Sequence, residues 1–364
     1  MSFEPNKMLR KGVISLEPYV PGRSIKDVQK EYGLDSVIKL ASNENVLGPS
    51  PLAISGLDFS LANIHRYPDS SSKSLRDSLG IYNNVDSNSI FIGNGGDDVL
   101  SVLARTILND GDEVILPTPS FSPYQHVSRL MGAVPIFIPL QNFEINLNKI
   151  LESLTKRTKL IFLCSPNNPT GKILSENQLL EFFGSLPKNI LVLIDEAYVD
   201  FVGKDKSVNT ISMLKDNSLF ILRSFSKIFG LAGLRVGYGI GDSELVSFMD
   251  RVREPFNVNS VAQTASLAAL NDSKFRNKVI KLVSEGRELL YTGFKSLGLN
   301  FIESQANFIF VNVGDGDKIS RELMKRGIIV RPGSFFKNKD WIRVTVGSSE
   351  EIKIFLKNLK ETLS

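Results

Sequence analysis

The chain has 364 residues, enough to bury a large core, and its composition of 42% hydrophobic, 9% aromatic and 23% charged residues is typical of a globular protein. Its formal net charge is only +4 and basic residues alternate with acidic ones, which argues against a nucleic-acid partner. No apolar run is long enough to span a bilayer, and residues 1–7 lack the apolar core of a signal peptide, so we expect a cytoplasmic protein without membrane contact.

Cysteine and histidine are too scarce to form a disulfide framework or a typical metal site. The only cysteine, Cys164, lies in an apolar run and is expected to be a buried structural thiol. The two histidines, His65 and His126, are isolated from each other, so we expect no metal.

The first 35 residues are rich in proline and glycine and show little periodicity. They predict an extended arm, of a kind that usually packs on something else, followed by a short helix over residues 24–32. A short strand over 37–40 and turn-rich loops at 41–51 and 65–69 follow.

Residues 36–262 predict one large domain in which helices alternate with strands. A helix is expected over 70–82 and another over 99–108, the second opened by a glycine-rich turn at 93–98. The expected strands are 89–92, 113–116, 134–138, 160–164, 190–194 and 219–222. Several are continuous apolar runs, which is typical of strands covered on both faces, so a mainly parallel α/β sheet is predicted.

Residues 263–364 predict a smaller α+β domain that packs with the N-terminal segment. A helical segment from 263 to 297 has a possible break near Asn271 and Asp272. Short strands at 305–311, 328–332 and 341–346 precede an amphipathic helix over 349–363.

Three successive strands of the large domain lead into polar residues that suit chemistry. Asn168 follows the strand at 160–164, Asp195 follows 190–194, and Lys227 follows 219–222. They are each about 30 residues apart, the length of one βαβ unit. In parallel sheets functional groups gather beyond the carboxyl ends of the strands, so the three side chains are expected to line one edge.

The chemistry of these residues favours pyridoxal 5′-phosphate as a cofactor. A lysine such as Lys227 forms a Schiff base with an aldehyde once cations and burial lower its pKa. Ser224, Ser226 and Arg235 offer hydrogen bonds to phosphate oxygens. A buried carboxylate such as Asp195 keeps a pyridine nitrogen protonated, and so apolar a strand predicts a cationic partner for it.

Further residues are placed to complete this site. Tyr198 and Asn168 are candidates to hydrogen-bond the ring oxygen, and Phe121 is a candidate to stack on the ring. Gly96 and Asp97 open a helix whose N–H groups suit an anion.

Each residue also has a simpler interpretation when it is taken alone. Lys227 is then a solvated loop lysine, Asp195 a helix cap, Asn168 a turn former, and Phe121 a core aromatic. A single glycine-rich turn is likewise more often a loop than an anion site.

Taken together, the motifs resemble those of the fold-type I, class II pyridoxal-phosphate-dependent aminotransferases, and most closely the histidinol-phosphate aminotransferases. The matching segments are residues 18–22 (Pro-Tyr-Val-Pro-Gly), 40–45 (Leu-Ala-Ser-Asn-Glu-Asn), 66–68 (Arg-Tyr-Pro), 93–95 (Gly-Asn-Gly), 165–171 (Ser-Pro-Asn-Asn-Pro-Thr-Gly), 195–198 (Asp-Glu-Ala-Tyr), 224–237, 253–259 and 343–347. They cover nearly the whole chain. One departure is Val46, where the family usually has proline.

The resemblance implies a role for each matching residue. The implied catalytic residues are Lys227, Asp195 and Tyr198, with Lys227 binding the cofactor and moving the substrate proton. The implied cofactor contacts further include Asn168 at the ring oxygen and, at the phosphate, Ser224, Ser226, Arg235, Gly96, Asp97 and Tyr67, the last from the neighbouring subunit of a homodimer. The implied substrate pocket holds Arg331, Arg343, Tyr19 and Asn307, with both arginines on the anionic end. The two arginines reach one pocket only if the loop 332–340 between them folds away.

The implied reaction converts histidinol phosphate and 2-oxoglutarate to imidazole acetol phosphate and glutamate by a ping-pong mechanism, within histidine biosynthesis. Two other enzymes remain open: an aromatic amino-acid aminotransferase of broad specificity and a threonine-phosphate decarboxylase on the same fold. A regulatory protein that binds the same cofactor is expected to carry a DNA-binding segment, and the sequence offers none.

Overall fold

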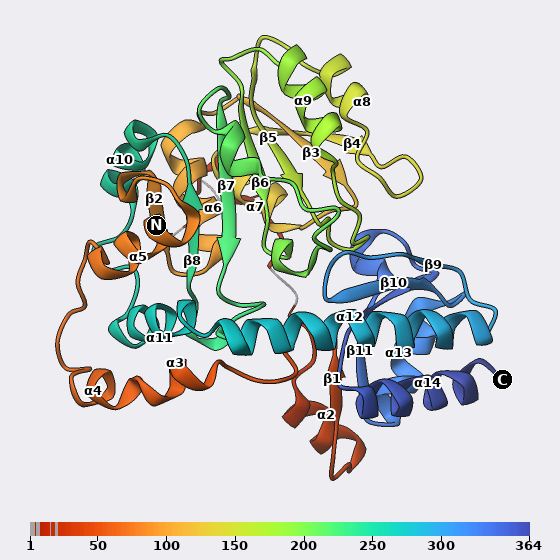
Figure 1. Cartoon of the computed structure of the whole chain (residues 1–364). Coiled ribbons are helices and arrows are strands. Elements are labelled where there is room, and N and C mark those ends of the chain that lie inside the picture. The colour runs from red at the N-terminus through yellow and green to blue at the C-terminus, as the bar shows by residue number, and fades with distance from the viewer. Residues whose placement is uncertain (1–3, 5–7, 15, 19–20) are drawn as a thin grey trace.

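Two separate β-sheets organise the part of the chain that the structure describes, one of seven strands and one of five (Figure 1). The structure is a computed structural model that describes residues 4, 8–14, 16–18 and 21–364. In Figure 1 the larger sheet occupies the upper part of the molecule and the smaller one lies at the lower right. Among the described residues no helix is both long and apolar enough to cross a membrane.

The larger sheet has the strand order β2-β8-β7-β6-β5-β3-β4. Its strands are β2 (Ile90–Gly93), β3 (Glu113–Thr118), β4 (Val134–Pro139), β5 (Thr158–Cys164), β6 (Leu191–Asp195), β7 (Leu219–Ser224) and β8 (Gly237–Ile240). Neighbours from β4 to β7 run parallel, and only β8 is antiparallel to its neighbours β7 and β2. The predicted mainly parallel α/β sheet is therefore confirmed.

Both faces of this sheet are buried, as its apolar strands predict. Along β5, Ile161 and Leu163 pack into one core, while Leu160 and Phe162 pack into another on the opposite face. This alternation follows from the two-residue period of a strand. Helices supply the other half of each core: α6, α7 and α10 on one face, and α5, α9, α11 and the start of α12 on the other.

The helices alternate with the strands along the chain. They are α1 (Lys11–Ile14), α2 (Ile25–Tyr32), α3 (Pro51–Ser55), α4 (Leu57–Ala62), α5 (Lys73–Asn83), α6 (Gly96–Ile107), α7 (Pro123–Leu130), α8 (Leu147–Glu152), α9 (Glu176–Ser185), α10 (Ser243–Val252), α11 (Ser260–Leu270), α12 (Ser273–Ser296), α13 (Gly316–Lys325) and α14 (Ser349–Leu363). The expected short helix near residue 25 and the final amphipathic helix are confirmed as α2 and α14.

The smaller sheet has the order β1-β11-β12-β10-β9. Its strands are β1 (Ile38–Leu40), β9 (Phe301–Ile302), β10 (Phe308–Asn312), β11 (Ile328–Pro332) and β12 (Trp341–Thr345). Residues 36–40 are predicted from the sequence to belong to the larger domain, and this prediction is wrong for β1. Strand β1 pairs in parallel with β11, and Leu40 is buried in the core of the smaller sheet.

The predicted helical segment 263–297 is two helices, and its break at Asn271 and Asp272 is confirmed. Asp272 caps α12, because its side chain accepts a hydrogen bond from the Phe275 N–H. Helix α12 then runs from one part of the molecule to the other (Figure 1). Val279 near its start is buried with the larger sheet, whereas Phe294 near its end is buried with the smaller one.

Candidate active site

The residues at the ends of β5, β6 and β7 meet in one cavity at the carboxyl edge of the larger sheet. Asp195 is the last residue of β6, and Asn168 and Lys227 follow β5 and β7 closely. The cavity is lined by Gly96, Asp97, Leu100, Phe121, Cys164, Asn168, Asp195, Ala197, Tyr198, Leu222, Ser224, Ser226, Lys227 and Arg235. Of the residues predicted to contact a cofactor, only Tyr67 is not among them.

Lys227 lies within this cavity with its amine beside Tyr198. Its Nζ is 5.6 Å from the centre of the Tyr198 ring and 3.5 Å from the Ser42 carbonyl oxygen. The Asn45 side chain donates hydrogen bonds to the carbonyls of Lys227 and Ile228 and so fixes the backbone. Burial, reinforced by the positive charge of Arg343, lowers the pKa of Lys227 to about 8. A larger share of the amine is therefore neutral and nucleophilic at physiological pH.

Asp195 is the most deeply placed acid of the cavity, with 4% of its surface exposed. Its Oδ2 accepts a hydrogen bond from the Tyr124 hydroxyl at 2.6 Å, and its Oδ1 accepts one from the Ala197 N–H at 2.9 Å. Burial raises the pKa of Asp195 to about 6, although these two hydrogen bonds oppose the shift. Both hydrogen-bond donors to the carboxylate are thus neutral, whereas the sequence predicts a cationic partner, and the positive charge of Lys227 acts on Asp195 without a hydrogen bond.

Tyr198 and Asn168 are both held by residues from the smaller sheet and its entry loop. The Tyr198 hydroxyl accepts a hydrogen bond from the Asn43 side chain at 3.0 Å. Asn168 Oδ1 accepts one from Arg343 Nη1 at 2.6 Å. The site therefore joins the two sheets.

The opposite end of the cavity is built from glycines and one arginine. Helix α6 starts here after Gly95, which has a φ of 88°, and a Cβ on Gly95 would lie 2.6 Å from Arg235 Nη2. A Cβ on Gly237 would lie 2.6 Å from the Gly96 nitrogen. Arg235 contacts Asp97 at 3.4 Å, and both side chains are about half exposed. The helix N-terminus and the guanidinium thus face the same space, which suits an anion.

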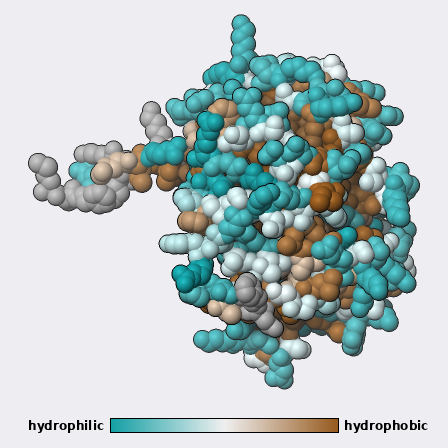
Figure 2. All heavy atoms as spheres, turned by 60° about the vertical axis from the view of Figure 1, so that its left-hand side comes forward, coloured by the Kyte–Doolittle hydropathy of each residue, from teal (hydrophilic) through white to brown (hydrophobic). Residues whose placement is uncertain are grey.

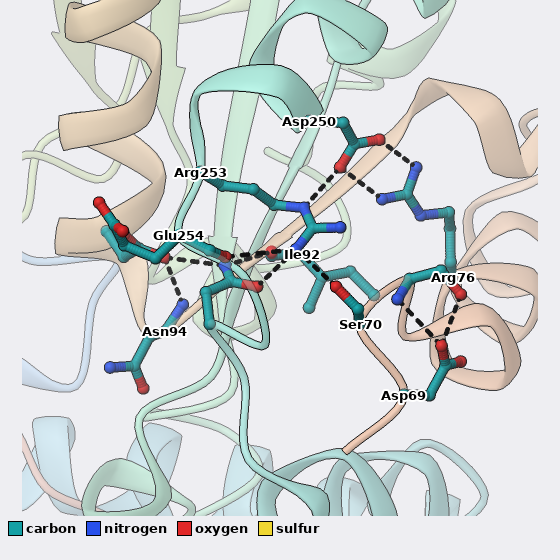
Figure 3. A network of polar contacts seen from close by, with 11 residues as sticks. Asp69, Ser70, Arg76, Ile92, Asn94, Asp250, Arg253 and Glu254 are labelled. Atoms are coloured by element: carbon teal, nitrogen blue, oxygen red, sulfur yellow. Dashed lines mark hydrogen bonds and ion pairs between the residues drawn. The ribbon is translucent and has the colours of Figure 1, made fainter. Parts of the chain in front are cut away.

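A polar network behind the turn at the start of α6 holds the carboxylate of Asp98, the residue after Asp97, away from the cavity. Asp98 Oδ2 accepts hydrogen bonds from the Asn94 N–H at 2.8 Å and from the Asn257 side chain at 3.1 Å. Arg253 contacts Asn257 on one side and Asp250 on the other. Figure 3 shows Arg253 bridging to Asp250 and Ser70, with Arg76 paired to the same Asp250 carboxylate.

The two arginines predicted to bind substrate lie directly opposite each other on neighbouring strands. Arg331 of β11 pairs in register with Arg343 of β12, so both side chains project from the same face of the sheet. The loop between them turns away through a short helix, Gly333–Phe336. Arg343 is 6% exposed and donates to Asn168, whereas Arg331 is partly exposed and stacks on the Phe335 ring at 3.6 Å.

The remaining predicted residues differ in what the structure says of them. Asn307 is buried and its side chain donates to the Asn43 carbonyl at 3.1 Å. Tyr67 is 82% exposed, lies outside the cavity and stacks on Phe256 with ring centres 4.6 Å apart. Tyr19 lies outside the described residues.

The residues of the site that were not predicted include Tyr124 and Asn43, which bond two of the predicted ones. Tyr124 contacts Asp195 from α7, and Asn43 contacts Tyr198 from the loop after β1. Asn43 was within a quoted motif, and its φ of 55° is a conformation that asparagine tolerates better than most residues. Tyr124 gave no comparable signal, because its partner is 71 residues away.

Comparisons with known proteins agree with this geometry. The profile of the family "Aminotransferase class I and II" matches residues 35–359. Histidinol-phosphate aminotransferase of Moorella thermoacetica is 42% identical over 358 residues, which are 98% of this chain and 93% of that protein. The enzyme of the same name from Caldicellulosiruptor saccharolyticus is 40% identical over 98% of this chain and all of its own length.

A solved structure has the same fold. The crystal structure of histidinol-phosphate aminotransferase from Sinorhizobium meliloti in complex with pyridoxal-5′-phosphate superposes with a TM-score of 0.89. It covers 98% of this chain and 97% of that one, at 22% sequence identity.

Proposed function

Because the chain belongs to the class I and II aminotransferase family, we propose that it transfers the amino group of histidinol phosphate to 2-oxoglutarate with pyridoxal 5′-phosphate as cofactor. The products are imidazole acetol phosphate and glutamate, and the reaction serves histidine biosynthesis. The observation that carries the proposal is the meeting of Lys227, Asp195 and Arg235 in one cavity. The names of relatives about 40% identical over nearly the full chain support the substrate.

The cavity fits the proposed cofactor by the chemistry of its two ends. A Cβ on Gly95 or Gly237 would clash with Arg235 or with the Gly96 nitrogen, so the two glycines let the guanidinium and the N-terminus of α6 lie close together, as a phosphate site requires. The buried Asp195 at the other end matches a protonated ring nitrogen. Pyridoxal 5′-phosphate supplies an aldehyde that reacts with amines and a ring that accepts electrons.

The side chains of the chain divide the remaining work. Lys227 Nζ, with its lowered pKa, would hold the aldehyde carbon of the cofactor with loss of water. Once the substrate amine had displaced it, the free lysine amine would take and return the proton of the substrate Cα. Asp195 would hold a proton on the ring nitrogen, and Asn168 and Tyr198 would orient the ring through its oxygen. Ser224, Ser226 and the N–H groups of Gly96 and Asp97 would bind the phosphate together with Arg235.

We assign the anionic end of the substrate to Arg331 and Arg343. Like charges directly opposite each other on two strands destabilise a sheet, and an anion between them removes that repulsion. Arg343 also touches Asn168, so an anion bound here lies beside the proposed cofactor ring. Asn307 lines the same pocket in this proposal, and so does Tyr19.

Half-reactions of the purified protein test the proposed substrate. The cofactor-loaded protein should be yellow and should lose its visible band with histidinol phosphate faster than with phenylalanine or threonine phosphate. Faster reaction with phenylalanine would identify an aromatic aminotransferase, and carbon dioxide release from threonine phosphate would identify a decarboxylase. The Lys227→Ala variant should lack the band, and a colourless wild type after reconstitution would refute the cofactor assignment.

We also propose a homodimer in which Tyr67 reaches the phosphate site of the partner subunit. Large apolar side chains are exposed on α3, α4 and the loop that follows, namely Leu52, Ile54, Leu61, Ile64 and Tyr67. Figure 2 shows brown, hydrophobic residues between teal ones on the side of the molecule that Figure 1 has at its left. A cytoplasmic location, expected from the sequence, stays a prediction.

Mixed dimers test whether Tyr67 crosses between subunits. A dimer of one Tyr67→Phe chain and one Lys227→Ala chain has one complete site if Tyr67 acts on the partner, and none if it acts within its own chain. We expect the mixed dimer to be more active than either parent. No gain in activity, or a monomer in light scattering, would refute this arrangement.

A further inference from the structure

We propose that Tyr124 is a positioning residue that keeps Asp195 ionised and correctly oriented toward the cofactor ring. This inference rests on the proposed function, because it concerns how Asp195 acts on the ring nitrogen. It starts from the 2.6 Å hydrogen bond between the Tyr124 hydroxyl and Asp195 Oδ2, the shortest contact made by that carboxylate.

The hydroxyl of Tyr124 has little freedom to point elsewhere. Its ring is 1% exposed and stacks on Phe162 of β5, with ring centres 4.8 Å apart and planes 8° from parallel. Phe121 packs edge-to-face with the Tyr124 ring, with ring centres 5.5 Å apart, and also lines the cavity. The Ser128 hydroxyl bonds the Tyr124 carbonyl within α7. Packing therefore sets the direction of the hydroxyl before any ligand arrives.

This direction fixes the carboxylate. Tyr124 holds Oδ2 and the Ala197 N–H holds Oδ1, so rotation of the Asp195 side chain would break both hydrogen bonds. Each oxygen keeps a lone pair for a further donor. The carboxylate thus presents a fixed edge to the cavity.

The hydroxyl also favours the charged form of Asp195. Burial of Tyr124, together with the adjacent Asp195 charge, raises its own pKa well above the usual value, so it remains a donor. A hydrogen bond donated to a carboxylate stabilises the anion. The other titratable groups near Asp195 are Cys164 and Tyr198, whose pKa values burial raises, together with Asp97, whose charge raises the Asp195 pKa, and Lys227, whose charge lowers it. Without Tyr124 the carboxyl competes better for the proton that it should leave on the ring nitrogen.

The Tyr124→Phe variant, loaded with cofactor labelled with ¹⁵N in the ring, tests the proposal. We expect the ¹⁵N chemical shift to move toward that of the unprotonated ring, and turnover to fall roughly 10- to 100-fold, the range for loss of one hydrogen bond to a charged group. Affinity for inorganic phosphate in the apoprotein should not change. Tyr238→Phe is the matched control, because Tyr238 of β8 is as deeply buried as Tyr124 and, among the residues that the structure describes, does not hydrogen-bond Asp195, and it should leave the ¹⁵N shift unchanged.

A second variant keeps the test open if the first does not fold. 3-Fluorotyrosine at position 124 keeps the ring and makes the hydroxyl a stronger donor, so the ¹⁵N shift should move the opposite way. A yellow wild type with a protonated ring, and variants with the same ¹⁵N shift, would overturn the role of Tyr124 alone. A wild type without the visible band would instead overturn the proposed function.

Discussion

The two ends of the active-site cavity differ in how far their side chains are exposed to solvent and in how firmly they are held. At one end Asp195, Tyr198 and Asn168 are each less than a tenth exposed and are held by hydrogen bonds of fixed direction, two of them to Asp195. At the other end Arg235 and Asp97 are about half exposed and their ion pair is long at 3.4 Å. The enclosed end has low effective dielectric, and the open end is screened by water.

This difference separates two tasks that a cofactor site must perform. Enclosed groups change the protonation of whatever they touch, because charge is costly there. Half-exposed charges contribute little each and act mainly on affinity. We therefore expect substitutions at the enclosed end to change reactivity, and those at the open end to change binding.

The largest expected effect is that of Asp195→Asn at the enclosed end. Removing one member of a buried ion pair costs roughly 3–5 kcal/mol, so turnover should fall at least about 10²-fold. The same substitution at Asp97 is the matched control for the open end and should reduce turnover far less. Steady-state kinetics at saturating cofactor measure the turnover of both variants. Equal losses of turnover would contradict the proposal that the two ends of the cavity perform different tasks.

In the apoprotein, the free energy of unfolding should depend on pH because of the Asp195 carboxyl. The pKa of Asp195 is about 6 when folded, above the unfolded value of about 3.9, so the folded state binds the extra proton between these values. The stability that this bound proton gives the folded state is fully present below pH ~4 and is lost as the pH rises to about 6. Apo Asp195→Asn should therefore exceed apo wild type by about 2–3 kcal/mol at pH 8, with the difference vanishing near pH 4.

Denaturant unfolding of both apoproteins across this pH range measures the effect. Apo Asp97→Asn is the matched acid-to-amide substitution at a half-exposed position of the same cavity. A constant offset between Asp195→Asn and wild type at every pH would mean that the pKa of Asp195 is the same in the folded and unfolded states.

A smaller effect is expected for Arg235→Gln at the open end. Loss of one charged donor from the phosphate site should weaken cofactor binding by about ten-fold, while turnover at saturating cofactor falls less than affinity does. Titration of the apoprotein with cofactor measures this. Arg251→Gln, at an exposed arginine of α10 that lies over the Phe248 ring, is the control. A greater loss in turnover than in affinity would place Arg235 in the chemistry itself.

The smallest effect is expected for Asn257→Ala in the network behind the phosphate turn. The substitution removes the 3.1 Å contact that helps to hold Asp98 away from the cavity, so phosphate affinity should fall about two- to five-fold. Isothermal titration with inorganic phosphate measures it. Asn358→Ala in α14 removes only a bond within its own helix and serves as the control. An unchanged phosphate affinity would show that the turn needs no support from this network.

The sequence predicted the strands and their terminal residues because apolar runs and their spacing are local signals. Asn168, Asp195 and Lys227 could be placed together for this reason. Strand β8 was not predicted as a strand, since its sequence Gly-Tyr-Gly-Ile has weak strand propensity. Gly239 is there because the Phe220 ring lies so close that a Cβ would meet it at 2.1 Å.

The features that the sequence could not predict are contacts between segments that lie far apart in the chain. Nothing near residue 124 indicates that a tyrosine hydroxyl will meet Asp195, since the contact depends on how α7 packs on β5. The same limit explains the misplaced β1, whose partner strand begins at Ile328. The alignment of Arg331 with Arg343 likewise depends on the turn between β11 and β12.

The pairing of β1 with β11 has a consequence for the order of events during synthesis. Ile38 leaves the ribosome long before its partner Ile328, so β1 remains unpaired until nearly the whole chain is made. The segment that follows β1 contains Asn43 and the Ser42 carbonyl, which contact Tyr198 and Lys227. The active site is therefore completed by the first strand and the last sheet together, and a truncated or stalled chain leaves it unfinished.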